Sequence, residues 1–100
     1  MKSFGYFKGL PYPDADECFD DYKAFRNEIP KEKIIEHIET LEEWFTSLPS
    51  VEIFSGTQMQ AGLYEDGEFV FPLEFLHYLK NYDIGVPYAY EEYLKTVFNL

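Results

Sequence analysis

Residues 59–82 read MQAGLYEDGEFVFPLEFLHYLKNY, and the rest of the chain is organised around this stretch. Asp66-Gly67 lies between two apolar segments, 63–65 and 68–71. An Asp-Gly pair in such a setting is the strongest short-range signal of a β-hairpin. We therefore expect two antiparallel strands joined by a type I′ turn, which requires positive φ at both of its central residues.

Pro72 follows the second predicted strand and suits the first turn of a helix, where its missing backbone N–H leaves no bond unmade. Beyond it the apolar period changes from 2 to 3.6, which predicts a helix over 73–82. The hairpin should thus run directly into a helix, and we expect this unit to form the core.

Helical spacing of apolar residues recurs in three other segments. In the first of them Asp14 is a predicted N-cap, and Cys18 falls within the apolar stripe, which favours a buried structural thiol. Alternating or β-prone residues predict two further short strands. The additional predicted helices are 14–27, 31–47 and one that begins after Pro87, and the additional strands are 2–7 and 51–54.

These elements predict an α+β fold: a small antiparallel sheet of three or four strands, with about four helices packed on one face. One hundred residues without repeats or a low-complexity linker predict a single domain, 1–100. One cysteine rules out an internal disulfide. Neither a signal peptide nor a run of 18 apolar residues is evident, so we expect a cytoplasmic protein that does not enter a membrane.

The charge is strongly negative, with nineteen Asp and Glu against eight Lys and Arg and a formal net charge of −11. Both halves of the chain carry the excess, so it belongs to the whole molecule. A field of this sign repels nucleic acid and anionic lipid and attracts basic proteins. Solubility alone is the alternative explanation, although small domains need only about 2–8 charges for it.

Four glutamates, Glu32, Glu36, Glu39 and Glu43, repeat at spacings of four, three and four along the predicted helix 31–47. They should form a ladder of like charge, with neighbours about 5–6 Å apart. Each like-charged pair costs about 0.2–0.5 kcal/mol, so an unpaired ladder is a candidate partner-binding surface. A merely solvated face is the other interpretation.

A second candidate surface combines tyrosines and acids near the C-terminus. Tyrosine supplies a large contact area at low rotamer entropy, and adjacent carboxylates select a basic partner. For the three tyrosines of this segment, Tyr88, Tyr90 and Tyr93, the structural alternative is two core rings and one exposed ring. The candidate residues are Tyr88, Tyr90, Glu91 and Glu92, with both glutamates expected to point away from the core.

Catalytic and metal-binding motifs are lacking in the sequence. His37 and His77 have no nucleophile at a motif spacing. Glu74 and His77 stand three apart, as in a di-iron ligand pair, but that site needs a second such pair, so solvated side chains are the favoured interpretation. We expect no enzyme activity and no cofactor, and a small enzyme or metal protein built on Glu74 and His77 is the competing hypothesis.

The C-terminal third, from Tyr64 to Pro72 and on through Phe75–Tyr82 to Val86-Pro87, resembles a pattern in small acidic bacterial proteins. Some of those resemble immunity proteins that neutralise a cognate toxin. The resemblance implies an inhibitor of a toxin. It carries over no functional residue, because residues 1–50 show no matching pattern.

Charge and resemblance together predict a non-enzymatic inhibitor that binds a basic protein, with a nuclease toxin as the favoured partner. Nuclease clefts are positive because their substrate is negative, and a rigid acidic face can cover such a cleft. The alternative is a phage-type mimic of nucleic acid, such as an anti-restriction or anti-CRISPR protein. Neither reading involves direct binding to nucleic acid. We expect a monomer or a weak homodimer.

Overall fold

The computed structural model describes residues 1–100 and contains four strands, three α-helices and one 3₁₀ helix, η1. The α+β class predicted from the sequence is confirmed. None of the helices is long and apolar enough to cross a membrane. In chain order the elements are β1 (Lys2–Ser3), η1 (Phe19–Ala24), α1 (Lys31–Glu39), β2 (Trp44–Val51), β3 (Gln58–Asp66), β4 (Phe69–Pro72), α2 (Leu73–Asn81) and α3 (Tyr88–Phe98).

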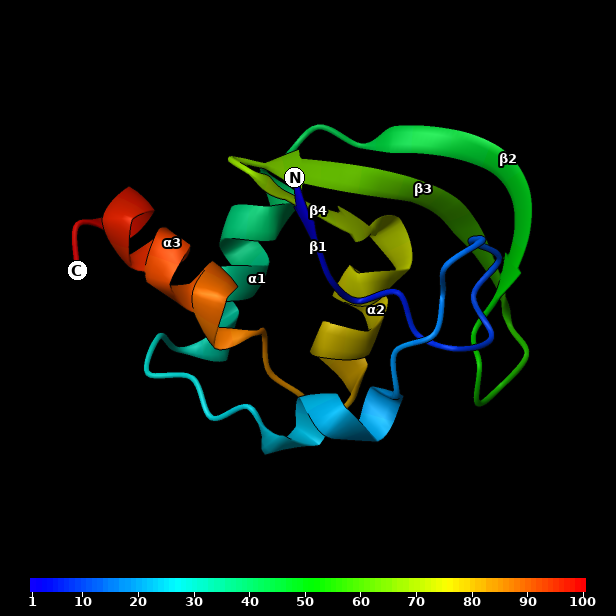
Figure 1. Cartoon of the computed structure of the whole chain (residues 1–100), viewed down its shortest axis with the longest axis horizontal. Coiled ribbons are helices and arrows are strands. Elements are labelled where there is room, and N and C mark those ends of the chain that lie inside the picture. The colour runs from blue at the N-terminus through cyan, green and yellow to red at the C-terminus, as the bar shows by residue number, and fades with distance from the viewer.

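The four strands form one open sheet in the order β1-β4-β3-β2. The pairs β2–β3 and β3–β4 are antiparallel, whereas β1 runs parallel to β4 and is much shorter than the strand predicted over 2–7. Figure 1 shows the sheet along the top of the molecule, with α1, α2 and η1 beneath it. β2 is thus a free edge of the sheet.

The hairpin and the helix after it are confirmed, but the turn type is not the predicted one. Asp66 pairs with Phe69, so the two central residues of the turn are Gly67 and Glu68. Gly67 has φ of 60°, whereas the φ of Glu68 is not positive. Positive φ at the first central position alone is the pattern of a type II′ turn, which places glycine there.

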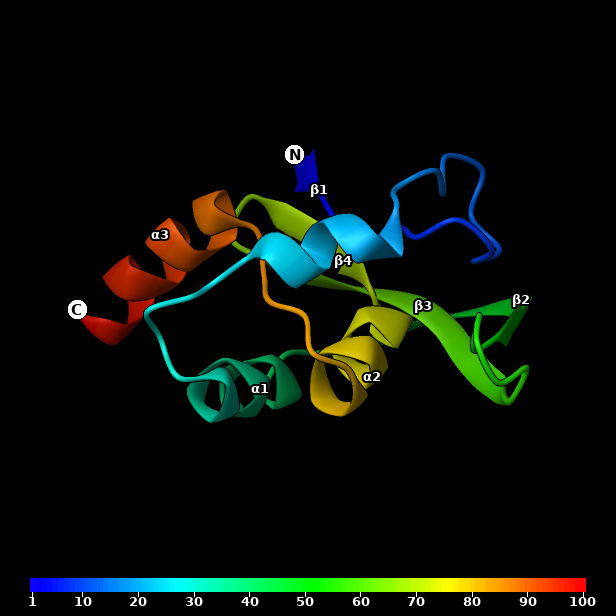
Figure 2. The same ribbon diagram turned by 90° about the horizontal axis from the view of Figure 1, so that it is seen from below.

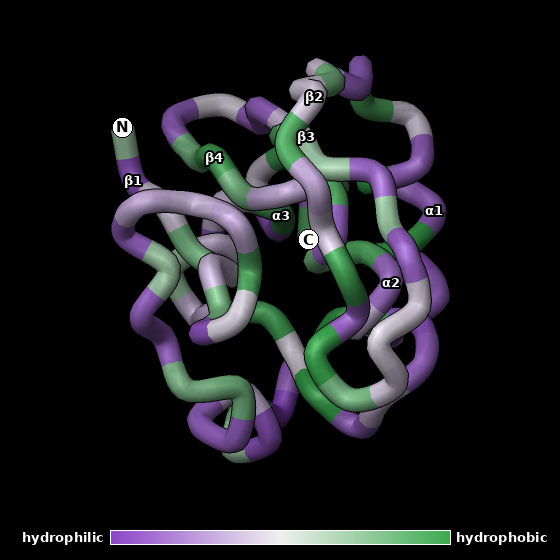
Figure 3. Tube along the Cα trace, turned by 90° about the vertical axis from the view of Figure 1, so that its right-hand side faces the viewer, coloured by the Kyte–Doolittle hydropathy of each residue, from purple (hydrophilic) through white to green (hydrophobic).

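The core lies between the sheet and the helices and is built largely from aromatic rings. Alternation along β4 puts Phe69 and Phe71 on the same face, and Figure 3 shows the hydrophobic colour running through this strand. Phe71 contacts Phe75 of α2 with ring centroids 5.9 Å apart, and Tyr90 of α3 at 5.4 Å. Edge-to-face and tilted pairs of this kind add to the burial of the rings themselves.

The helix predicted over 31–47 is wrong in its second half. α1 ends at Glu39, and the chain then crosses to the sheet as β2. Pro49 disfavours helix at its own position and at the residue before it, while Trp44 and Phe45 favour a strand. Pairing with β3 provides hydrogen bonds for the backbone of this segment. Residues expected on a buried helical stripe therefore lie at the sheet edge instead.

The helix predicted over 14–27 is also wrong, because only the short η1 forms in this region. The carboxylate of Glu17 accepts hydrogen bonds from the Tyr6 backbone N–H at 3.0 Å and from the Tyr22 hydroxyl at 2.7 Å. It therefore ties the N-terminal segment to η1 instead of completing a helix cap. Cys18, expected in the core, is free and exposed.

Residues 52–57 form the connection between β2 and β3, in place of the strand predicted over 51–54. The buried carboxylate of Glu52 organises this connection: it accepts hydrogen bonds from the Phe54 backbone N–H and the Tyr82 hydroxyl, both at 2.6 Å. Burial alone would raise the pKa of Glu52, but these bonds and those from Ser55 lower it to about 2.

Candidate protein-binding surface

The predicted glutamate ladder is only partly assembled. Glu32, Glu36 and Glu39 lie on α1 and are exposed, but Glu43 comes after the helix has ended. Glu39 is not free, because its carboxylate binds the Lys80 ammonium group at 2.7 Å. Glu32 and Glu36 remain as adjacent, exposed carboxylates on one helix, without an ion pair.

Glu43 takes a different position, just before β2. Its Oε2 atom lies 3.5 Å from the hydroxyl of Tyr64, a buried residue of β3. Burial, followed by the charge of Glu43, raises the pKa of Tyr64 to about 12. The glutamate predicted as the last rung of the ladder thus belongs to the edge of the sheet.

The four residues predicted near the C-terminus do not share one surface. Tyr88 is exposed at the start of α3, and its hydroxyl accepts a hydrogen bond from the Arg26 backbone N–H at 3.1 Å. Glu92 is exposed and pairs with Lys95 at 3.2 Å. Tyr90 is fully buried. Only Tyr88 and Glu92 are therefore accessible to a partner.

Glu91 was expected to point away from the core, and this is wrong. Its carboxylate is buried and accepts hydrogen bonds from the backbone N–H groups of Glu28 and Ile29, at 2.6 and 3.0 Å, and from the Asn27 amide. Burial raises its pKa, but these donors and the charge of Lys95 lower it on balance. Glu91 thus fixes segment 27–29 against α3.

A polar cluster at the hairpin was not predicted from the sequence, in which Asp66 was expected only as a turn residue. Asp66 is buried and accepts hydrogen bonds from the hydroxyls of Tyr90 at 2.6 Å and Tyr93 at 3.1 Å. His37 Nε2 lies 2.8 Å from Asp66 Oδ2. The cluster joins β3 to α1 and α3, and no local sequence signal identifies it because its members come from three elements.

Glu74 and His77 both line one groove beside α2, but their side chains have different partners. Glu74 was expected at the solvated face, but it is buried and accepts hydrogen bonds from the hydroxyls of Tyr12 and Ser50, both at 2.6 Å. His77 instead directs Nε2 toward Glu52, with the nearest carboxylate oxygen at 3.6 Å. No group of three or more His, Cys, Asp or Glu side chains is placed to hold a metal ion.

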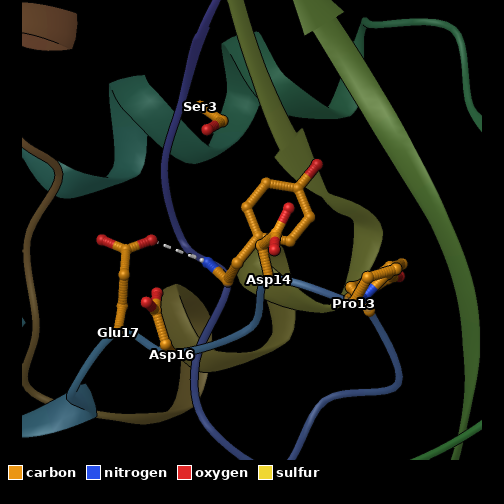
Figure 4. A pocket seen from close by; sticks show the side chains of 7 residues that line it. Ser3, Pro13, Asp14, Asp16 and Glu17 are labelled. Carbon is orange, nitrogen blue, oxygen red and sulfur yellow. Dashed lines mark hydrogen bonds between the residues drawn. The ribbon is translucent and has the colours of Figure 1, made fainter.

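A hollow of about 600 Å³ lies beside the N-terminal segment, and it is lined by Ser3, Tyr6, Tyr12, Pro13, Asp14, Asp16 and Glu17. Figure 4 shows the carboxylate of Asp16 beside that of Glu17, with the Asp14 carboxylate farther away, toward Pro13. Of the three, only Glu17 is bonded within the fold, to the Tyr6 N–H and the Tyr22 hydroxyl. The two remaining carboxylates add to the negative potential on this side of the molecule.

Two groups stand out among the nineteen acidic residues, and the other six are half-buried or held in ion pairs. Four carboxylates, those of Glu52, Asp66, Glu74 and Glu91, are buried and make internal hydrogen bonds. Nine others are exposed and have no ion pair: Asp14, Asp16, Asp21, Glu32, Glu36, Glu42, Glu43, Glu65 and Asp83.

Seven of the eight Lys and Arg side chains make contacts within the fold, and only the exposed Lys8 has no ion pair, side-chain hydrogen bond or cation–π contact. Four lysines are already held in ion pairs: Lys2, Lys23, Lys80 and Lys95. Arg26 donates to backbone carbonyls, Lys31 donates to the Tyr82 carbonyl at 2.7 Å, and Lys33 lies over the Phe98 ring.

Comparison of the chain with protein-family models, with curated proteins and with solved structures finds no match. Functional inference therefore rests on the residues of this chain and their arrangement.

Proposed function

We propose that this chain is a non-enzymatic inhibitor that binds and neutralises a basic protein, with a nuclease toxin as the favoured partner, in the manner of an immunity protein. The observation that carries the proposal is the set of nine exposed carboxylates without an ion pair, on a molecule of net charge −11. Because these carboxylates have no internal ion pair, they are free to pair with the cations of a partner.

Electrostatics links this surface to fast inhibition. Complementary potentials raise the rate of association between proteins by about 10–1000-fold at low ionic strength. An inhibitor of a toxin that damages its own host benefits from such a rate. A nuclease cleft, positive because its substrate is a polyanion, is the complement of the surface described above.

Two titratable groups of the kinds often used in catalysis, His37 and Glu74, are engaged within the fold, which supports a binding role. His37 contacts Asp66, and Glu74 accepts two hydrogen bonds from neighbouring hydroxyls. Each contact joins separate elements, and each therefore has a structural explanation. The hypothesis of a small enzyme based on Glu74 and His77 has less support, because Glu74 is buried and both of its carboxylate oxygens accept hydrogen bonds within the fold.

The alternative of a nucleic-acid mimic has less support. Mimicry requires carboxylates that follow the spacing of phosphates along a strand or groove. The glutamate ladder was the regular acidic array in the sequence, and it ends at Glu39, which is paired with Lys80. Of that array only Glu32 and Glu36 stay free on α1, and the other free carboxylates come from other parts of the chain.

The test uses the protein encoded by the reading frame adjacent to this one. That product should be basic and toxic when expressed alone, and co-expression of this chain should restore growth. With both proteins purified, one equivalent of this chain should abolish cleavage of plasmid DNA. Association measured by stopped flow should slow by about tenfold or more between 20 and 300 mM NaCl, because salt screens the steering field.

A matched pair of double variants compares the effect of unpaired carboxylates on association with that of carboxylates held in ion pairs. Glu32→Gln with Glu36→Gln removes two unpaired carboxylates, whereas Glu68→Gln with Glu92→Gln removes two that already face lysines. The first pair should slow association more than the second. Absence of any complex with the adjacent product would contradict the proposal, and inhibition of a restriction or CRISPR nuclease instead would support the mimic.

A further inference from the structure

The edge strand β2 presents exposed apolar side chains in an unusual concentration. Trp44 is 52% exposed and Phe45 is 64% exposed, and Leu48 and Val51 of the same strand are also largely exposed. The remaining large exposed apolar residues are scattered over the loops, the termini and α3. Figures 1 and 2 show β2 at the rim of the molecule, with no helix along its free edge.

The two aromatic side chains project to opposite faces of the sheet. Trp44 stands opposite Leu63 of β3, and Phe45 stands opposite Gly62, so they follow the alternation of a strand. Phe45 borders a groove of about 350 Å³ between the sheet and α2, with Met59 and Leu76 among its walls. Together the two rings form an apolar rim around the end of the sheet.

Unpaired carboxylates surround this rim. Glu42 and Glu43 directly precede Trp44, and Glu65 follows Leu63 by two residues, on the face of the sheet that carries Trp44. None of the three has an ion pair. The only lysine in the groove, Lys80, is held by Glu39. The exposed rings of the edge therefore have a negative border formed by these three carboxylates.

Two occupants of this edge are disfavoured by its own features. A second copy of the chain would bring a net charge of −11, and a second set of these carboxylates, against the first. An added β-strand would meet an irregular edge, because residues 46–48 stand opposite Ala61 alone and Pro49 has no N–H to donate. Recognition here must come from side chains.

We infer that Trp44 and Phe45 are the anchors of the interface with the basic partner. The inference rests on the proposed function and specifies its contact: the partner supplies an apolar cleft for the two rings, with Lys or Arg side chains that face Glu42, Glu43 and Glu65. Aromatic anchors surrounded by polar contacts are the usual arrangement of an interface hot spot. The charges steer the approach, and the rings hold the complex.

Trp44 is the only tryptophan of the chain, which makes this surface directly observable. Protein labelled with 5-fluorotryptophan has a single ¹⁹F resonance, and the unlabelled product of the adjacent reading frame adds none. Titration with that product should shift or broaden the resonance. The double variant Trp44→Ser/Phe45→Ser should weaken binding by about 30-fold or more, chiefly through faster dissociation.

The matched control is Val97→Ser, which removes an apolar side chain of similar exposure, 42%, from α3. It should change the affinity less than twofold. Because the exchanged side chains are exposed, thermal melts should show that both variants fold. A complex that forms with the wild-type chain and is equally tight with the double variant would overturn the inference while leaving the proposed function intact. Absence of a wild-type complex would overturn both.

A measurement without the partner tests the local charge. Caesium ions should quench Trp44 fluorescence more efficiently than iodide, relative to free N-acetyltryptophanamide, because the carboxylates attract the cation and repel the anion. Glu42→Gln with Glu43→Gln should reduce this preference. Equal quenching by both ions would overturn the negative border. A dimer seen by analytical ultracentrifugation, and lost in the double variant, would show that a second copy occupies the edge instead.

Discussion

Glu52→Gln should lower stability by about 2 kcal/mol at pH 7. The Glu52 carboxylate holds the 52–57 connection together through bonds from Phe54, Ser55 and Tyr82, and the amide of glutamine accepts fewer of them. A folded-state pKa of about 2 against an ordinary value of 4.5 corresponds to about 3 kcal/mol, at 1.4 kcal/mol per pH unit. Solvent screening at the neighbouring turn reduces the figure to about 2 kcal/mol.

The pH dependence identifies the mechanism. Because the pKa of Glu52 is lower in the folded state, the ionised carboxylate stabilises the fold fully above pH 4.5, and this contribution is lost as the pH falls from 4.5 toward 2. Urea unfolding, followed by circular dichroism between pH 2.5 and 7, measures both proteins. The difference in unfolding free energy should be constant above about pH 5 and shrink below it.

Glu32→Gln provides the control, since it exchanges an exposed glutamate that makes no ion pair. It should change the unfolding free energy by less than about 0.5 kcal/mol. A difference between wild type and Glu52→Gln that stays the same from pH 7 to pH 2.5 would refute the reasoning, because the charge of Glu52 would then contribute nothing.

Three further substitutions or modifications test the structure. Gly67→Ala should cost about 1–2 kcal/mol in urea unfolding, because φ is 60° and the added Cβ would lie 2.7 Å from the Tyr93 ring; identical midpoints would mean that the turn is misplaced. Cys18 should react with a disulfide reagent in the native protein, since it is exposed; reaction only after addition of urea would return it to the core. Asp66→Asn should cost about 1–3 kcal/mol, because His37 and two tyrosine hydroxyls lose part of a buried acceptor; an unchanged thermal midpoint would show that the cluster is dispensable.

Local sequence signals predicted the elements whose residues interact with near neighbours. The hairpin and α2 follow from a glycine at a tight turn, a proline at a strand end and a change of apolar period, all within residues 59–82. The helix after Pro87 was equally recognisable. The same reasoning failed for residues 44–48, whose apolar spacing fits a helix as well as an edge strand. Pairing with β3 makes this segment a strand, and that pairing depends on residues far away in the chain.

For the candidate surface, too, some properties could be predicted from the sequence and others depended on the tertiary structure. Composition alone determined that the molecule is strongly acidic, and it indicated a basic partner as the complement of that charge. Composition could not distinguish buried carboxylates from free ones, because a carboxylate such as Glu91 becomes internal only where folding brings N–H donors to it.

The sequence by itself therefore determined the fold class, the hairpin and the sign of the charge, which are properties of composition and of short-range geometry. Only the tertiary structure decided that Trp44 and Phe45 lie exposed on an edge strand, among free carboxylates. Exposure and ion pairing are relations between distant segments, and chain folding sets them through contacts that no local pattern encodes.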